Sequence, residues 1–357
     1  MKRDEIGSEF WERPSQKGSY RCTELNQNSK RWFISGRTAL DYIIRDIIKK
    51  CGVFSVAMPS YYCYSMVEPF LRNGISEIEF YDVVPSVEGI HISSQITADV
   101  VYVIDYFGVS SKQVRDIVYE SSQKGKIIIC DLTQSVFCRN DYADMYDYAF
   151  CSYRKWFFSN AAVAVTNWEF DIDYSVKEDE FFTRIRLEAA QEKDDYIHCI
   201  TSEKGYLEKY HKADVSLKDH YVGFTPNHDE VKYVTYVDDD FIVRRRRENA
   251  AFILQELKEC ANTQFRLFTD IIGENEVPLF VPILLDNSVR YNLREYLKQQ
   301  YIYCPIHWPI TEYHNQLTQK QKALYNNELS LVCDQRYSLA DMQREVNAIK
   351  AFFEKNS

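Results

Sequence analysis

The hydrophobic positions of this chain alternate between short continuous apolar runs and stripes at helical spacing. The runs that read as buried strands are FSVAMP (54–59), EIEFYDV (77–83), DVVYVIDYFG (99–108), KIIICD (126–131), YAFC (148–151) and AAVAVTN (161–167). Between them, residues 40–48 carry an i, i+3, i+4 apolar stripe, and helices are also expected from about residue 63 and over 112–123. This alternation predicts an α/β fold with a mostly parallel central sheet flanked by helices.

The second half of the chain changes character. Residues 170–235 are charged and helical, and a long helix is expected from about 240 to 260. Apolar runs at 277–285 and 301–306 then alternate with helices near 288–300 and 339–353, which predicts a smaller α+β C-terminal domain. We therefore expect an N-terminal arm over residues 1–30, a large domain over 31–238 and a small domain over 239–357. The run Arg244–Arg247 is most simply a solvated or inter-domain helix face, and phosphate binding is the alternative.

Composition narrows the class of protein. The net charge of −10 over 357 residues argues against a partner that is a nucleic acid or an anionic membrane, since either would need a basic face. The N-terminus lacks an apolar signal core, and no apolar run approaches the ~20 residues of a membrane span. The ten cysteines form no CxxC pair and no zinc spacing, so they predict free thiols, no metal site and a reducing, cytoplasmic compartment. The many aromatic residues indicate core packing or, alternatively, a pocket for a flat ring or a sugar.

Candidate chemistry gathers just after the strands, where parallel sheets bind ligands. Asp131 ends one strand and would face the crevice, either to hold a protonated ring nitrogen or simply to cap a helix. Lys155 lies three residues after Ser152, beyond the next strand. Its amine could become nucleophilic toward an aldehyde through desolvation and neighbouring cations, although an isolated lysine is usually a surface charge. The Ser152 hydroxyl could bind a phosphate.

Two further segments have the same ambiguity. Ser-Gly-Arg-Thr at 35–38 opens a helix, where backbone N–H groups bind phosphate, but Ser35 could equally be a plain cap. The turn Pro59–Tyr64 follows a strand, and a tyrosine there could stack on a planar cofactor or pack in the core.

Taken together, these motifs resemble those of the DegT-type (StrS-type) sugar aminotransferases, which belong to pyridoxal phosphate (PLP) fold type I. SGRTAL resembles the family's Ser-Gly-Thr-x-Ala-Leu helix start, DYFG its His-x-x-Gly strand end, and DLTQ its Asp-x-x-Gln motif. RRRRENAAFIL, PIHWP and LSLVCDQRYSLADM are similar to its C-terminal segments. The resemblance covers residues 30–350.

This resemblance implies a PLP-dependent aminotransferase that moves an amino group from glutamate to a nucleotide-linked keto sugar. Lys155 would form the Schiff base and shuttle the proton, Asp131 would pair with the pyridine nitrogen, and Gln134 would contact the ring hydroxyl. The remaining cofactor-binding set is Gly36, Arg37, Thr38, Tyr62 and Ser152, with His307 and Tyr64 on the substrate side. The family works as homodimers with active sites at the subunit interface.

The chain departs from the family pattern at three places. The spacing from Ser152 to Lys155 is shorter than usual, and the turn at residues 159–162 is Ser-Asn-Ala-Ala instead of Gly-Glu-Gly-Gly. Cys63 aligns with the ring-stacking aromatic, so that Tyr62 or Tyr64 would have to substitute. The asparagine that reaches the phosphate from the partner subunit has no identified counterpart.

Two other functions stay open: a PLP enzyme of another reaction, such as sugar dehydration, and a non-catalytic member of the fold. Retention of Lys155 favours transamination over dehydration, because the family's sugar dehydratases have histidine there. A Rossmann dehydrogenase is disfavoured, since no GxGxxG follows any strand.

Overall fold

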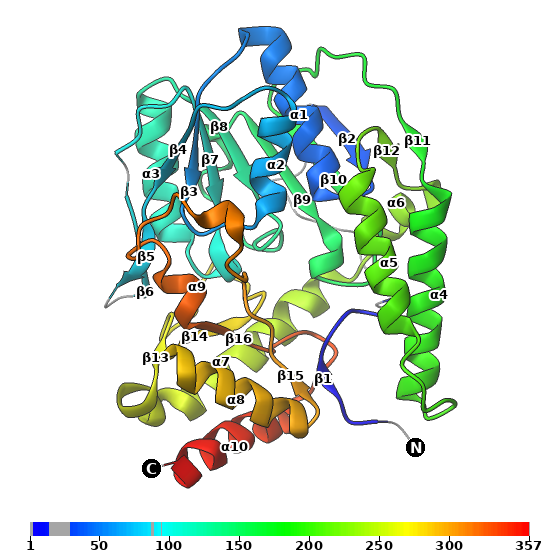
Figure 1. Ribbon diagram of the computed structural model, residues 1–357, viewed down its shortest axis with the longest axis vertical. Coiled ribbons are helices and arrows are strands. Elements are labelled where there is room, and N and C mark those ends of the chain that lie inside the picture. Colours follow the sequence, from blue (N-terminus) through cyan, green and yellow to red (C-terminus); the bar gives the residue numbers. More distant parts are fainter. Residues whose placement is uncertain (1–2, 14–28, 87–88, 94, 357) are drawn as a thin grey trace.

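A seven-stranded sheet forms the centre of the molecule (Figure 1). The computed structural model describes residues 3–13, 29–86, 89–93 and 95–356. In sheet order the strands are β2 (Ser29–Phe33), β10 (Ala162–Thr166), β9 (Tyr148–Ser152), β8 (Ile127–Asp131), β7 (Val100–Ile104), β3 (Val56–Pro59) and β4 (Ile78–Tyr81). The last five run parallel, and only β10 is antiparallel to its neighbours. The mostly parallel sheet predicted from the apolar runs is therefore confirmed.

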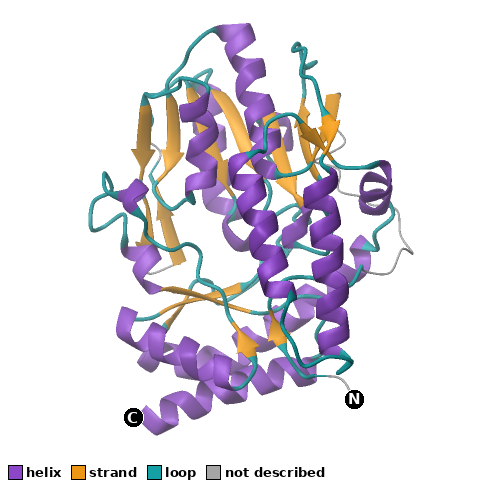
Figure 2. Ribbon diagram, turned by 45° about the vertical axis from the view of Figure 1, so that its right-hand side comes forward, coloured by secondary structure: helices purple, strands orange, loops and turns teal. Residues whose placement is uncertain are grey.

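Helices flank this sheet, as Figure 2 shows. They are α1 (Gly36–Cys51), α2 (Tyr64–Arg72), α3 (Ser111–Gln123), α4 (Glu180–Ile197), α5 (Tyr206–Asp219) and α6 (His228–Thr235). The predicted stripe of α1 packs on β9 and β10, while α3 packs on β7 and β8. Helix α1 begins where the sequence indicates, since the Ser35 side chain accepts a hydrogen bond from the Thr38 N–H.

The C-terminal part is the smaller α+β unit that the sequence predicts. Its antiparallel sheet contains β13 (Arg266–Leu267), β14 (Val281–Leu284) and β16 (Glu328–Leu331). The long helix α7 (Asp239–Gln264), α8 (Asn287–Gln299) and α10 (Leu339–Asn356) pack with it around a second hydrophobic core. Leu279 and Leu324, however, belong to the first core, so the two units share residues and a boundary at 238/239 stays a prediction. Short elements complete the fold: β5 (Val83–Ser86), β6 (Gly89–Ile92), β11 (Lys177–Glu178), β12 (Phe224–Thr225) and α9 (Ala323–Asn327).

The described N-terminal residues are more integrated than a polar arm. Strand β1 (Ile6–Gly7) pairs in parallel with β15 (Ile302–Tyr303), nearly three hundred residues away. Phe10 and Trp11 are buried in a cluster with residues of α4 and α5. Figure 1 shows this segment running between the small unit and those helices. Residues 14–28 of the expected arm lie outside the described residues, and strand β2 already begins at Ser29.

The arginine run in α7 contributes an internal contact. Arg246 is 1% exposed, and its guanidinium lies 4.6 Å from the centre of the Trp156 ring. It donates to Gln335 Oε1 (2.8 Å) and to the carbonyl oxygen of Leu279 (2.9 Å). Arg244 is exposed. The inter-domain interpretation therefore holds for Arg246, and the phosphate alternative does not, because these N–H groups already have acceptors.

We expect Arg246→Met to destabilise the protein by about 3 kcal/mol, because it leaves buried acceptors without a donor. Urea unfolding of the two proteins would measure the difference. Arg244→Met, on the exposed side of α7, is the control and should unfold with the wild type. Equal midpoints for all three proteins would show that the buried guanidinium contributes nothing net.

Among the described residues, no helix is long and apolar enough to cross a bilayer. The described cysteines are free thiols, with Cys130 and Cys151 buried as predicted, whereas Cys51 and Cys199 are exposed.

Candidate active site

The strand register brings the candidate residues to one edge of the sheet. Asp131, the last residue of β8, lies opposite Phe150 of β9, so Ser152, two residues further on, points to the same face. The start of α1 closes this edge, since a Cβ added to Gly36 would meet the Phe150 ring and the Ser152 Cβ at 3.4 Å. A cavity of about 150 Å³ results. Its lining includes Gly36, Arg37, Cys63, Met66, Tyr102, Asp131, Thr133, Gln134, Ser152, Arg154, Lys155, Leu279, His307 and Trp308.

Asp131 is buried and held by two donors. Its Oδ2 accepts from the Tyr102 hydroxyl (2.7 Å), and its Oδ1 accepts from the Thr133 N–H (2.9 Å). Burial raises the pKa of Asp131, and the hydrogen bonds from Thr133 and Tyr102 oppose this rise. Such a carboxylate is poised to pair with a cation that enters the cavity.

Lys155 ends a 3₁₀ turn (Tyr153–Lys155) directly after β9. The turn is anchored by the fully buried Trp156, whose indole Nε1 donates to the Thr133 carbonyl oxygen (2.8 Å). Thr133 also accepts from the Ser152 N–H through its Oγ1 (3.3 Å). Thr133 thus ties together the ends of β8 and β9. The Lys155 side chain lines this cavity and a second one beside it.

The unusual turn behind Lys155 is fixed by neighbouring helices. The Asn160 N–H donates to Glu230 Oε2 (2.9 Å) of α6, and Asn160 Oδ1 accepts from Arg186 Nε (2.8 Å) of α4. The Ala161 N–H donates to Ser159 Oγ (3.1 Å). Side chains from α4 and α6 therefore hold the Ser-Asn-Ala-Ala sequence in place.

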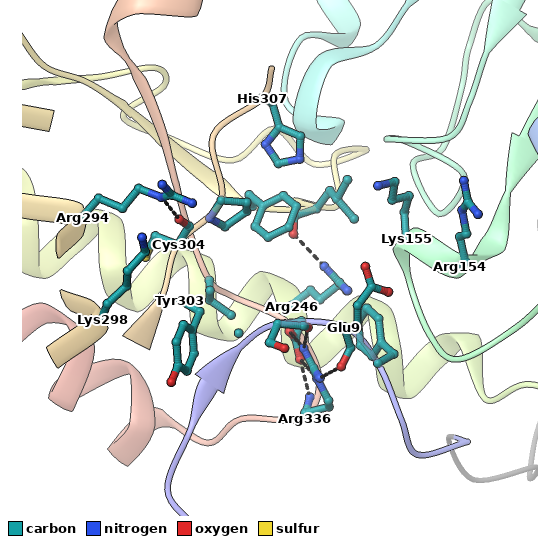
Figure 3. A pocket seen from close by; sticks show the side chains of 18 residues that line it. Glu9, Arg154, Lys155, Arg246, Arg294, Lys298, Tyr303, Cys304, His307 and Arg336 are labelled. Carbon is teal, nitrogen blue, oxygen red and sulfur yellow. Dashed lines mark hydrogen bonds and ion pairs between the residues drawn. The ribbon is translucent and has the colours of Figure 1, made fainter. Parts of the chain in front are cut away.

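The second cavity, of about 290 Å³, lies between Lys155 and the small unit (Figure 3). Figure 3 shows Arg294 and Lys298 of α8 across the cavity from Lys155, with His307 between the two sides. Glu9 lines the part of this cavity that is formed by the N-terminal segment. Burial raises the pKa of Glu9, but the positive charges of Arg186, Lys155 and Arg154 outweigh this effect and lower it. Cations thus dominate the lining.

His307 lines both cavities and is kept neutral by its surroundings. Burial, together with the charge of Lys155, lowers the pKa of His307 to about 3. Its Nδ1 lies 3.0 Å from Ser330 Oγ, and its backbone N–H donates to Glu328 Oε2 (2.8 Å). The imidazole can therefore accept or donate a hydrogen bond without carrying charge.

Glu328, beneath His307, gives the protein a specific pH dependence. Burial raises the pKa of Glu328 to about 7 from an ordinary value of 4.5. The folded protein therefore binds this proton more tightly than the unfolded chain, and the resulting stability is present below pH 4.5 and lost as the pH rises through 7. Between pH 4.5 and 8, we expect the free energy of unfolding of the wild type to fall by on the order of 3 kcal/mol relative to that of Glu328→Gln. Urea unfolding across this range would measure it, and parallel pH profiles would contradict the prediction.

The structure brings most of the predicted site residues together. Gly36, Arg37, Asp131, Gln134, Ser152, Lys155 and His307 all line the first cavity. Gln134 is oriented by its Oε1, which accepts from the Phe107 N–H (2.7 Å). The Arg37 guanidinium lies 3.2 Å from the Glu68 carboxylate. The Arg37 side chain is thus engaged, and its backbone N–H stays the donor to the cavity, as the sequence suggested.

Three predicted residues lie elsewhere. The Tyr62 ring stacks on Phe80 at 5.1 Å, and its hydroxyl donates to the Tyr313 carbonyl oxygen (3.0 Å), so Tyr62 cannot stack on a ligand in either cavity. Tyr64 stacks on the Tyr313 ring at 3.6 Å. The Thr38 hydroxyl donates to the Tyr221 carbonyl oxygen (2.8 Å) and secures α1. None of the three lines the two cavities.

Sequence reasoning missed several lining residues, namely Tyr102, Thr133 and Arg154, whereas Cys63 lies at the position that aligns with the family's stacking aromatic. Tyr102 had a usable signal, because Ile104 pairs with Asp131 and Tyr102 lies two residues earlier on the same face of β7. Away from this site, Glu12, Asp194 and His198 place ligand atoms within 4.8 Å of one another, a grouping that the sequence did not indicate.

The fold and this cavity define a class: the chain has the fold of the PLP-dependent aminotransferases. No protein-family model and no curated protein sequence matches it. Solved structures do match over nearly the whole chain. Helicobacter pylori PseC, an aminotransferase involved in the biosynthesis of pseudoaminic acid, is 14% identical with a TM-score of 0.64, over 98% of this chain and 100% of PseC.

Two other matches have bound molecules. NtdA from Bacillus subtilis with bound cofactor PMP is 14% identical (TM-score 0.61; 93% of this chain, 75% of NtdA). DesI in the presence of its TDP-sugar product is 12% identical (TM-score 0.60; 92% of this chain, 82% of DesI). At these identities the likeness establishes the fold, in agreement with the fold type I expectation.

The first cavity has room for the ring of the cofactor that this fold implies. A cavity of about 150 Å³ in other proteins holds a benzene ring, and the space beside Asp131 has this volume. Donors for a phosphate lie at its α1 end, where the first-turn N–H groups have no intrahelical acceptor and the Ser152 side chain lines the wall. Cys63 and Met66 supply sulfur atoms in place of a stacking aromatic.

Proposed function

We propose that the chain is a PLP-dependent aminotransferase, a divergent relative of the DegT-type family, which moves an amino group from glutamate to a nucleotide-linked keto sugar. It would work in the cytoplasm as a homodimer. The observation that carries the proposal is the convergence of Asp131, Ser152, Lys155 and the start of α1 on one ring-sized cavity.

The predicted site residues that line the first cavity have specific roles in this reaction. PLP, when bound, supplies an electron sink for bond breaking at the substrate carbon. The Asp131 carboxylate holds the proton on the ring nitrogen, and the Gln134 amide would contact the ring hydroxyl. Gly36 and Arg37, through backbone N–H groups, and the Ser152 hydroxyl bind the phosphate. Lys155 holds the cofactor and moves a proton between it and the substrate carbon.

The second cavity supports an anionic reactant. Arg294 and Lys298 face Lys155 across it, and this separation suits a molecule that reacts at one end and carries negative charge at the other. Glutamate and a nucleotide-linked sugar both have this form. DesI, a protein of the same fold, has a TDP-sugar as its product, which favours the nucleotide-linked acceptor. His307, neutral and at the junction of the cavities, is positioned to hydrogen-bond the substrate.

The function can be tested in two steps. Purified protein incubated with PLP should gain a visible absorbance band, and glutamate should then remove that band with one equivalent of 2-oxoglutarate formed. The second step is recovery of the band with a nucleotide-linked keto sugar, accompanied by formation of the amino sugar. Band formation without any response to glutamate would point to a different PLP reaction, and no band at saturating PLP would exclude the proposal.

A further inference from the structure

Arg154, the residue before Lys155, has no ion-pair partner among the residues that the structure describes. Its Nη1 atom is buried and donates to no acceptor among the described residues. The nearby Glu9 carboxylate pairs with Arg186 instead, at 3.7 Å. Because a buried charged group without an acceptor is costly, this Nη1 atom calls for an acceptor that the described residues do not supply.

The surroundings of Arg154 make this need stronger. Burial lowers the pKa of Arg154, and the positive charge of Arg186 lowers it further, as does that of Arg37. Asp214 and Glu9 act in the opposite direction without reversing the effect. Burial is the largest of these effects, and an anion bound beside Arg154 would offset its cost.

Arg154 lies at the phosphate end of the first cavity. It shares the lining with Gly36, Arg37 and Ser152. Arg154 also lines the second cavity, where Figure 3 shows it beyond Lys155 as seen from Arg294 and Lys298. The partner-free guanidinium and the free N–H groups of the first turn of α1 thus belong to one wall.

Apart from Lys155, no other described lining residue of this cavity has a positive charge without an ion-pair partner. The Arg37 guanidinium lies 3.2 Å from Glu68 and over the Tyr221 ring at 5.2 Å. Ser152 and the amides of α1 contribute only partial charge. With Lys155 engaged at the ring in the proposed reaction, a phosphate with nearly two negative charges has Arg154 as its remaining full counter-charge among the described lining residues.

We propose that Arg154 binds the cofactor phosphate from within the same chain, in the place where the related family uses an asparagine of the partner subunit. The inference rests on the proposed function, since it takes PLP as the occupant of the first cavity. It explains why the chain tolerates an arginine beside the reactive lysine.

The test compares PLP with pyridoxal, which has the same ring and aldehyde but no phosphate. Dissociation constants of both compounds, measured from the visible band, would be obtained for the wild type, Arg154→Gln, Arg154→Lys and the control Arg115→Gln. Arg115, on α3, forms an exposed ion pair with Asp141. Removing the Arg115 charge should therefore have little effect on either affinity. We expect Arg154→Gln to bind PLP about 10- to 100-fold more weakly, from the loss of one charge-assisted hydrogen bond, with pyridoxal affinity unchanged.

Arg154→Lys should lie between the wild type and the glutamine variant for PLP, and it serves as the test if the glutamine variant does not fold. Equal PLP affinities in all proteins would overturn the inference, as would an equal loss of affinity for PLP and pyridoxal. A change only in the KM for glutamate would assign Arg154 to the substrate and would also overturn it. If the wild type forms no band with PLP, the proposed function fails first, and Arg154 then has no cofactor phosphate to bind.

Discussion

Replacing Lys155 with alanine should abolish the lysine-linked visible band and stop amino transfer. Lys155 is the lysine that lines both cavities, so it alone among the described lining lysines reaches the ring site and the substrate site. Loss of its proton transfer would by itself cost about 10²- to 10⁴-fold in rate, and loss of the covalent link would add to this. Absorbance of the PLP-loaded protein and 2-oxoglutarate formation from glutamate would measure the two effects.

Lys212→Ala is the matched control. Lys212 lies on α5, more than half exposed, in an ion pair with Glu208, and its removal should leave the band and the rate unchanged. Peptide mapping after borohydride reduction would identify the modified lysine in the wild type. A reducible lysine link that persists in Lys155→Ala would place the cofactor on another residue and refute the assignment.

The sequence predicted this constellation because its determinants are local. Apolar runs that end at Asp131 and just before Ser152 identify strand ends, and parallel strands place those ends at one edge of a sheet. The stripe after Ser35 identifies the start of α1 in the same way. Once the strands are parallel neighbours, their terminal side chains meet without any further information.

The turn at Tyr62 and Cys63 could not be predicted in this way. Which of the two side chains faces the cavity depends on a segment about 250 residues later. The Tyr62 N–H donates to the Tyr325 hydroxyl (2.8 Å), its own hydroxyl donates to the Tyr313 carbonyl oxygen, and His314 packs on its ring. These contacts hold the buried Tyr62 ring away from the cavity and leave Cys63 against it, and no spacing within the turn indicates them.

The N-terminal segment escaped prediction for a related reason. Strand β1 has two residues, too few for any periodicity, and its burial comes from pairing with β15. The same segment carries Glu9 to the wall of the second cavity. The shape and charge of the substrate side therefore depend on the docking of a segment whose own sequence indicates only polarity.

Replacing Asp131 with asparagine should slow amino transfer by on the order of 10²- to 10³-fold, the usual cost of removing one preorganised electrostatic group. Asparagine keeps the size of the side chain and can still accept from Thr133, but it has no negative charge to keep a proton on the ring nitrogen. The phosphate end of the cavity is untouched, so PLP affinity should change much less than the rate. Single-turnover loss of the visible band with glutamate would measure the rate, and titration with PLP would measure the affinity.

The control is the same substitution at the opposite edge of the sheet. Asp99 precedes β7 and accepts from the Ser55 N–H (3.0 Å) and hydroxyl (2.8 Å) at the surface, so Asp99→Asn should leave the rate and the PLP affinity unchanged.

Burial raises the pKa of Asp131, and a bound ring cation would lower it again, so that cofactor and carboxylate stabilise each other's charged forms. Asp131→Asn should therefore bind the cofactor with its ring nitrogen unprotonated at neutral pH. A rate equal to that of the wild type would show that Asp131 only orders the ends of β7 and β8 through Tyr102 and Thr133.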